Sequence, residues 1–215
     1  MMKKGFSIFL SVLLVISLVA CSNTDSGDVP IKTPAQEFLG DLALTGSLPL
    51  SYAEQFTVDF YQGDYALVSI SDGSRFLLVP EGSSQPEALD SDIVVLQQPV
   101  TDIYLTATSV MCLFDALEAL DSITMSGTRA KDWYIENAKV AMENGKIAYA
   151  GKYSEPDYEM ILASGCKLSV QSTMANHAPE VKEKLLDLGI PVLVDQSNYM
   201  NGLAVGLVEV CYKML

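Results

Sequence analysis

The chain has 215 residues, and its 49% of hydrophobic residues suffice for the core of one domain or of one lobe of a larger protein. Its 27 acidic and 13 basic side chains give a formal net charge of −14, which repels phosphate groups and argues against nucleic acid as a partner. The same charge would attract a cationic ligand or a basic docking surface, or it could serve solubility alone.

The first 21 residues combine a positively charged start with an apolar run that ends on a cysteine. Two lysines precede Phe6 to Val19, a run typical of a signal peptide and too short for a comfortable transmembrane helix. Leu18 to Cys21 resembles the lipobox of bacterial lipoproteins, in which the signal is cut before the cysteine and its thiol receives a diacylglycerol. The resemblance implies a signal peptide over residues 1–20, a lipidated Cys21 and a location on the extracytoplasmic face of a bacterial membrane. The alternative is an ordinary secretory signal with an incidental cysteine.

The segment that follows the cysteine is polar. It contains glycine, two prolines and few large apolar residues, a composition typical of flexible linkers. We therefore expect residues 21–34 to tether a folded domain to lipid, where each buried acyl methylene contributes about 0.8 kcal/mol. Removal of Lys3 and Lys4 with the signal would change the net charge from −14 to −16.

Short segments that alternate apolar and polar residues come next. They are Phe56 to Tyr61, Tyr65 to Ser71 and Arg75 to Val79. Gln62-Gly63-Asp64 and Asp72-Gly73-Ser74 separate them, and both triplets have the residues that tight turns require. The pattern predicts a small antiparallel β meander within residues 35–90.

From residue 91 onward, apolar β-type runs alternate with helical periods. The expected strands are Ile93 to Leu96, Ser122 to Met125, Ile147 to Ala150, Lys167 to Val170 and Pro191 to Val194. The expected helices are Ser109 to Leu120, Lys131 to Glu143, Pro156 to Ser164 and Pro179 to Leu188. This spacing predicts an α/β fold over residues 91–199, in which a parallel sheet with helices on both faces forms a three-layer helix/sheet/helix lobe.

Motifs of catalysis and of metal binding are missing from the sequence. It has no GxSxG, GxxxxGK[ST] or HExxH pattern, so we expect neither an enzyme nor a resident cofactor. A single histidine, His177, argues against a bare transition-metal site, and it could contact a ligand or be a surface or capping residue. Besides Cys21, the cysteines are Cys112, Cys166 and Cys211, without CxxC spacing. Cys112 and Cys166 lie in apolar segments and are expected to be small core residues.

Three loops hold the candidate ligand-binding residues, because ligands of open α/β sheets bind beyond the carboxyl ends of the strands. The candidates are Thr108 and Ser109 in residues 105–109, Thr128, Arg129 and Trp133 in or just after residues 127–131, and Ser172 and Thr173 in residues 171–174. Hydroxyl groups and a helix N-terminus can donate to anionic oxygens. Arg129 can pair with a carboxylate or phosphate, and Trp133 and Tyr134 can add aromatic surface. Each loop could instead show ordinary turn and capping chemistry.

Segments between Asp92 and Asp195 resemble a known family. They are Ser109 to Leu120, Met125-Ser126-Gly127 and Gly151 to Leu162. In these segments the chain resembles the amino-terminal lobe of the substrate-binding lipoproteins of ABC importers for iron–siderophore, haem and cobalamin. The resemblance implies a solute-binding protein whose partners are an importer permease and a chelated metal or corrinoid.

The segment from Gly151 to Leu162 resembles the part of the family in which a carboxylate-bearing helix leads into a strand that ends in the ligand cleft. In the family, an exposed glutamate at the start of that helix docks on an arginine of the permease. The resemblance implies Glu159 as the first docking candidate and Glu155 as the second. Both acids could instead merely favour a helix N-terminus.

Family members continue with a long helix and a second α/β lobe, and the ligand lies between the two lobes. Residues 200–215 are apolar and do not match that continuation. The expectation is therefore a truncated binding protein that arose from a frameshift or a split gene. The alternative function is a lipoprotein scaffold that binds partner proteins through an exposed sheet edge and transports no small molecule.

Overall fold

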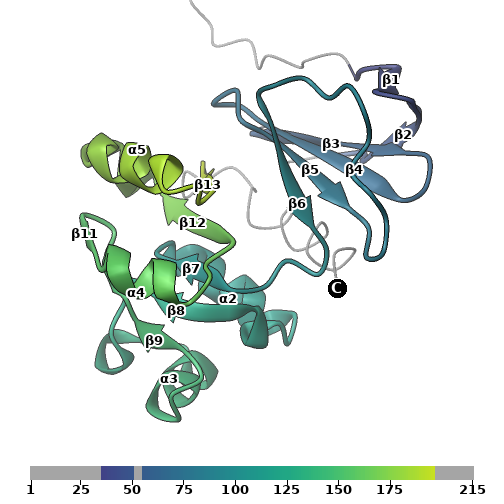
Figure 1. Ribbon diagram of the computed structural model, residues 1–215. Helices are drawn as coiled ribbons and strands as arrows, with labels where there is room; N and C mark the ends of the chain where they lie inside the picture. The colour runs from purple at the N-terminus through teal and green to yellow at the C-terminus, as the bar shows by residue number, and fades with distance from the viewer. Residues whose placement is uncertain (1–34, 51–54, 197–215) are drawn as a thin grey trace, which may run out of the picture.

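Residues 35–50 and 55–196 are described by a computed structural model, and they form a mixed α/β fold around two large sheets (Figure 1). The expected signal peptide, the lipidated Cys21, the tether up to residue 34 and the aberrant tail of residues 200–215 lie outside the described residues. Within the described ranges, no helix has the length and apolar character needed to cross a membrane.

The first sheet contains six strands in the order β1-β2-β3-β4-β5-β6. They are β1 (Phe38–Leu39), β2 (Leu42–Ser47), β3 (Phe56–Tyr61), β4 (Tyr65–Ile70), β5 (Arg75–Val79) and β6 (Ile93–Gln97). Neighbours from β1 to β5 are antiparallel, whereas β5 and β6 are parallel. The predicted antiparallel meander is confirmed in β3, β4 and β5, since alternation and turn residues are local signals.

The prediction that Ile93 to Leu96 opens the parallel sheet is wrong. This strand, β6, pairs with β5 from Arg75↔Ile93 to Val79↔Gln97 and therefore completes the first sheet. The second sheet begins only at β7 (Ile103–Leu105), whose three residues are too few to show a period. An apolar run predicts a strand, but the choice of partner depends on packing.

Arg75 holds together the long connection between β5 and β6. Its Nε and Nη2 donate to the two carboxylate oxygens of Asp92 at 2.8 and 2.6 Å, and Nη2 also donates to Asp90 at 2.8 Å. These hydrogen bonds favour the charged carboxylates, so the Arg75 guanidinium lowers the pKa of both Asp90 and Asp92. We call this group the Arg75 clamp.

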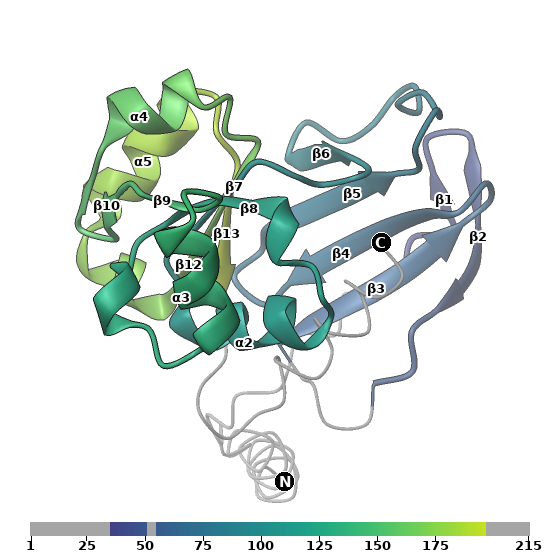
Figure 2. The ribbon, with the colours of Figure 1, turned by 90° about the horizontal axis from the view of Figure 1, so that it is seen from below.

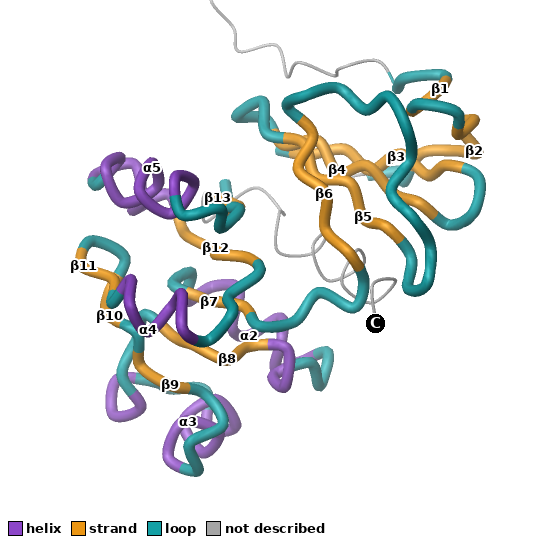
Figure 3. Tube along the Cα trace, in the orientation of Figure 1, coloured by secondary structure: helices purple, strands orange, loops and turns teal. Residues whose placement is uncertain are grey.

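The second sheet contains five parallel strands in the order β13-β12-β7-β8-β9. Beyond β7 they are β8 (Ile123–Ser126), β9 (Ala148–Tyr149), β12 (Leu168–Ser172) and β13 (Val192–Asp195). The helices that connect and flank them are α2 (Thr108–Ala116), α3 (Glu136–Glu143), α4 (Tyr158–Ala163) and α5 (Pro179–Asp187). The chain winds outward from β7 to β9 and then returns to the other side of β7, so its direction reverses between β7 and β12. In Figure 3 these helices gather around the parallel strands.

Three predicted helices are shorter than expected. The helix predicted from Ser109 ends at Ala116, and Glu118 then adopts a positive φ of 57°. The 3₁₀ turns η2 (Leu120–Ser122) and η3 (Ala130–Asp132) take up residues that were expected in the first two helices. The predicted helix from Pro156 begins only at Tyr158, because β10 (Gly151–Lys152) and β11 (Glu155–Pro156) form a hairpin. Its N-cap is Asp157, whose carboxylate accepts from the Met160 backbone N–H at 3.0 Å.

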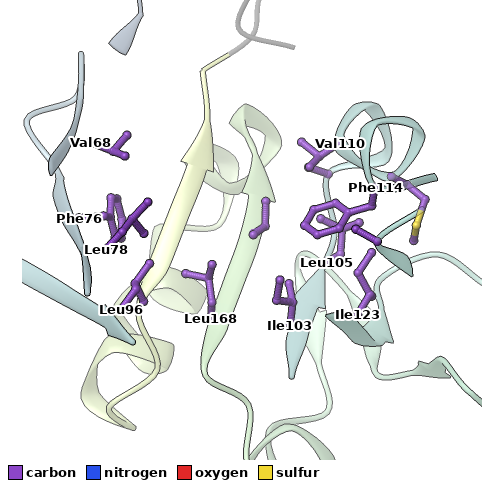
Figure 4. Close-up of a cluster of buried hydrophobic side chains, with 14 of the residues drawn as sticks. Val68, Phe76, Leu78, Leu96, Ile103, Leu105, Val110, Phe114, Ile123 and Leu168 are labelled. Atoms are coloured by element: carbon purple, nitrogen blue, oxygen red, sulfur yellow. The ribbon is translucent and has the colours of Figure 1, made fainter. Parts of the chain in front are cut away.

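One hydrophobic core joins the two sheets. Buried residues of β4, β5 and β6 meet residues of β7, β12 and α2 in a single cluster, which Figure 4 shows in close-up. Among its members are Val68, Phe76, Leu78, Leu96, Ile103, Leu105, Val110, Phe114 and Leu168. The first sheet therefore packs on the same face of the parallel sheet as α2. Figure 2 shows the two sheets side by side along this contact.

The opposite face of the parallel sheet has its own core. Tyr104 of β7 and Met125 of β8 pack there with Ile161 of α4 and with Val181 and Leu185 of α5. Along β7, Ile103 and Leu105 belong to one core and Tyr104 to the other. The strand is thus apolar on both faces, as strands of covered parallel sheets are.

Candidate functional site

The loops after β7, β8 and β12 start at one edge of the parallel sheet, because parallel strands end on the same side. The backbone ladder continues a step beyond the strands: the Thr106 N–H donates to the Val170 carbonyl and the Gly127 N–H to the Leu105 carbonyl, both at 2.8 Å. We call this side of the sheet, with the loops that leave it, the carboxyl edge. It contains the point between β7 and β12 at which ligands of doubly wound sheets bind.

The first loop leads into α2, where Thr108 and Ser109 are both exposed. The N-cap residue Ala107 has no capping side chain, and the first turn has no acid. The Ser109 hydroxyl donates instead to a carboxylate oxygen of Asp195 at 2.9 Å. Asp195 ends β13 and is 3% exposed. The sequence analysis did not identify Asp195 as a site residue. The one sequence feature that could have indicated it is the position of an acid at the carboxyl end of the last expected strand.

The second loop is a tight turn that ends in an exposed arginine. The Thr128 N–H donates to the Ser126 hydroxyl at 3.0 Å, and that hydroxyl donates to the Thr128 carbonyl at 2.9 Å. The Arg129 guanidinium carbon lies 4.7 Å from the centroid of the Tyr149 ring, within the range of a cation–π contact. Among the described residues, no ion pair includes Arg129. The turn therefore presents a cation that no carboxylate of these residues neutralises.

The first two loops pack directly against each other. A Cβ added to Gly127 would lie 2.8 Å from Thr106 Cγ2 and 3.2 Å from Thr106 Cα. Both contacts are closer than ordinary van der Waals distance. Glycine is therefore the residue that fits where the chain leaves β8, and this close approach fixes the start of the Thr128–Arg129 turn.

The third loop begins later than expected, because β12 continues through Ser172. Ser172 accepts a weak hydrogen bond from the Met174 N–H at 3.4 Å, and Thr173 begins the 3₁₀ turn η4 (Thr173–His177). Both are half-buried. Gln171 is a fully buried strand residue rather than part of the loop, and its Nε2 donates to the Ser169 hydroxyl at 3.2 Å.

Trp133 does not offer the aromatic surface that was expected of it. Its side chain is 8% exposed and belongs to the core that joins the two sheets. Its neighbour Tyr134 is fully exposed. From sequence alone, two adjacent aromatic residues after a turn do not reveal which of them packs inward.

The two docking candidates differ in their surroundings. Glu159 lies in the first turn of α4 and is exposed. Glu155 is not at a helix start, because it belongs to β11, where its carboxylate pairs with Lys152 Nζ at 3.2 Å. The alternative explanation, that the acid merely favours a helix N-terminus, therefore applies to Glu159 alone.

The described residues also include the histidine and two of the cysteines, Cys112 and Cys166. His177 is exposed at the end of η4. The expectation that Cys112 is a core residue is wrong, since it is exposed on α2 and its thiol donates to the Ser109 carbonyl at 2.8 Å. Cys166 is half-buried, and burial raises the pKa of its thiol. Within residues 35–50 and 55–196, no group of His, Cys, Asp and Glu side chains is arranged to hold a metal ion.

No protein-family model matches the chain, and a search of curated proteins finds no relative.

Proposed function

We propose that the protein is a lipid-anchored solute-binding protein that captures a chelated metal or corrinoid for an ABC importer. The solute would be an iron–siderophore, haem or cobalamin. The observation that supports this proposal best is the carboxyl edge, where three loops with hydroxyl groups leave one parallel sheet beside its point of reversal. One of these loops carries Arg129, which no carboxylate of the described residues pairs with. The proposal also draws on the sequence resemblance to binding lipoproteins of this type.

The proposed lobe is a three-layer helix/sheet/helix unit. Its sheet is the parallel one, with α2 and α3 on one face and α4 and α5 on the other. The first sheet, with its packing against the α2 face, is then an extension at the amino end of the lobe rather than a separate module.

In this proposal the carboxyl edge binds the solute from one side. Arg129 pairs with an anionic group of the chelate, and the Thr108, Thr128 and Thr173 hydroxyls donate to its oxygens. From β8 to β13 the edge spans three strand spacings, or about 14 Å. This width suits a chelate or a corrinoid better than a bare ion.

Titration of the detergent-solubilised full-length chain tests the binding step. Ferric siderophores, haem and cobalamin are added separately and followed by calorimetry, and saturable binding of one of them is the expected result. Arg129→Gln is expected to weaken that binding about tenfold or more, because a hydrogen bond to a charged group contributes roughly 1.5–3 kcal/mol. Lys131→Gln is the matched control, since Lys131 is an exposed cation two residues away. If the folded chain binds none of these solutes, the transport proposal fails and the scaffold alternative remains.

A second experiment tests the proposed partner. Glu159→Gln is expected to reduce co-purification of the chain with an importer permease from membranes, while solute affinity stays unchanged. Glu155→Gln serves as the comparison, because Glu155 is already paired with Lys152. Unchanged co-purification together with lost solute affinity would rule out the docking role of Glu159.

A further inference from the structure

The amino end of α2 carries positive charge that its own sequence does not neutralise. The helix is nine residues long, and its dipole is positive at this end. The Val110 N–H donates to the Ala107 carbonyl at 3.1 Å, but Ala107 has no capping side chain and no acid lies in the first turn. A helix end of this kind attracts an anion.

The protein brings its own anion to this position. Asp195 comes from the end of β13, 86 residues further along the chain, and accepts the Ser109 hydroxyl at 2.9 Å. The parallel register pairs Asp195 with Ser172, which fixes the carboxylate at the level where the strands end. Figure 2 shows β13 running toward α2. Since Asp195 is only 3% exposed, its charge requires compensation from neighbouring groups, and the Ser109 hydroxyl in the first turn of α2 is one of them.

The next loop of the carboxyl edge, after β8, has the opposite character. Arg129 is exposed and stacks on Tyr149, and no ion pair of the described residues includes it. The loop after β8 thus has a cation available to solvent, whereas the neighbouring loop after β7 leads to a helix start with an internal carboxylate beside it.

We infer that Asp195 is a built-in counter-anion of α2 that determines specificity: it keeps anionic groups of a ligand away from the α2 end and directs them to Arg129. The ligand class that fits is a molecule with its anionic group next to Arg129 and an uncharged or cationic group next to the α2 start. This ligand class rests on the proposed function, whereas the pairing of Asp195 with α2 does not.

Chemical rescue of Asp195→Ala in the full-length chain tests the inference. The substitution removes a carboxylate and leaves space that formate can fill. We expect the Tm of the variant to fall by several degrees in chloride buffer, and formate at equal ionic strength to recover at least half of the loss. Wild type and Asp187→Ala, which lacks an exposed acid of α5, should respond equally to formate and chloride. Equal responses of Asp195→Ala to the two salts would overturn the inference.

Asp195→Asn keeps the side-chain volume and an acceptor for Ser109, so it covers the case in which Asp195→Ala does not fold. With the charge removed, inorganic phosphate should raise the Tm of this variant more than that of wild type, in which only Arg129 is open to the anion. An identical phosphate response in the two proteins would contradict the counter-anion role. Neither anion test uses the transported solute, so failure of solute binding and failure of this inference are separate results.

Discussion

Gly127→Ala tests how closely the first two loops of the carboxyl edge are packed. The added Cβ would lie 2.8 Å from Thr106 Cγ2, about 0.6 Å inside the 3.4 Å at which ordinary contact begins. One contacted atom is the Thr106 Cα, which cannot rotate away as a side chain can. Overpacking of this kind costs about 1–3 kcal/mol, and we expect about 2 kcal/mol here. For a chain of this size, that corresponds to a fall in Tm of roughly 4–8 °C.

Urea unfolding of the full-length chain measures this loss of stability. Gly46→Ala is the matched control, because no atom lies within 4 Å of its added Cβ, and its free energy of unfolding should change by less than about 0.5 kcal/mol. Thr106→Ser removes Cγ2, the closest contact, so the double variant should recover part of the stability that Gly127→Ala loses. If Gly127→Ala is as stable as wild type, or if Thr106→Ser recovers nothing, the packing argument is wrong.

Three further predictions concern stability. Gly151→Ala should destabilise the chain in urea much more than Gly73→Ala. The backbone φ is positive at both glycines, but only at Gly151 would an added Cβ overlap a backbone carbonyl. Equal losses of stability in the two variants would contradict the geometry of the β10–β11 hairpin. Because the Arg75 clamp lowers the pKa of its two aspartate partners below the ordinary 3.8, its stabilisation is complete above that value and disappears as the pH falls through the lowered pKa values. The unfolding midpoints of wild type and Arg75→Met should therefore converge in acid. A difference between the two midpoints that does not depend on pH would show that the Arg75 clamp does not stabilise the fold through these carboxylates. Tyr104→Phe removes a 2.8 Å hydrogen bond to the Gly151 carbonyl and should cost about 1 kcal/mol at neutral pH. Burial raises the pKa of Tyr104 above its ordinary 10.0, so the stability advantage of wild type over Tyr104→Phe should shrink as the pH rises beyond 10. A stability difference between the two proteins that stays constant up to pH 11 would contradict the burial of this hydroxyl.

Local patterns predicted those parts of the fold that depend on local physics. Alternation over Phe56 to Tyr61 and the turn at Asp72-Gly73-Ser74 predicted β3, β4 and β5 to within a residue at each end. Likewise, Pro179 begins α5, as predicted, because proline suits the first turn of a helix. The loops after β7 and β8 leave one edge of the sheet as predicted, whereas the third loop begins only after Ser172, because β12 continues through that residue.

Contacts between distant segments decided the rest. The partner of β6, the inward packing of Trp133 and the exposure of Cys112 depend on which surfaces meet in the core, and no window of sequence contains that information. The chemistry of the edge shows the same division. Hydroxyl groups and Arg129 could be named from the sequence, but the carboxylate that neutralises α2 comes from Asp195, 86 residues after Ser109. The sequence by itself determined the elements and the groups available to a ligand, because these follow from neighbouring residues. Only the tertiary structure decided which of those groups are already occupied, because strand order brings distant charges together.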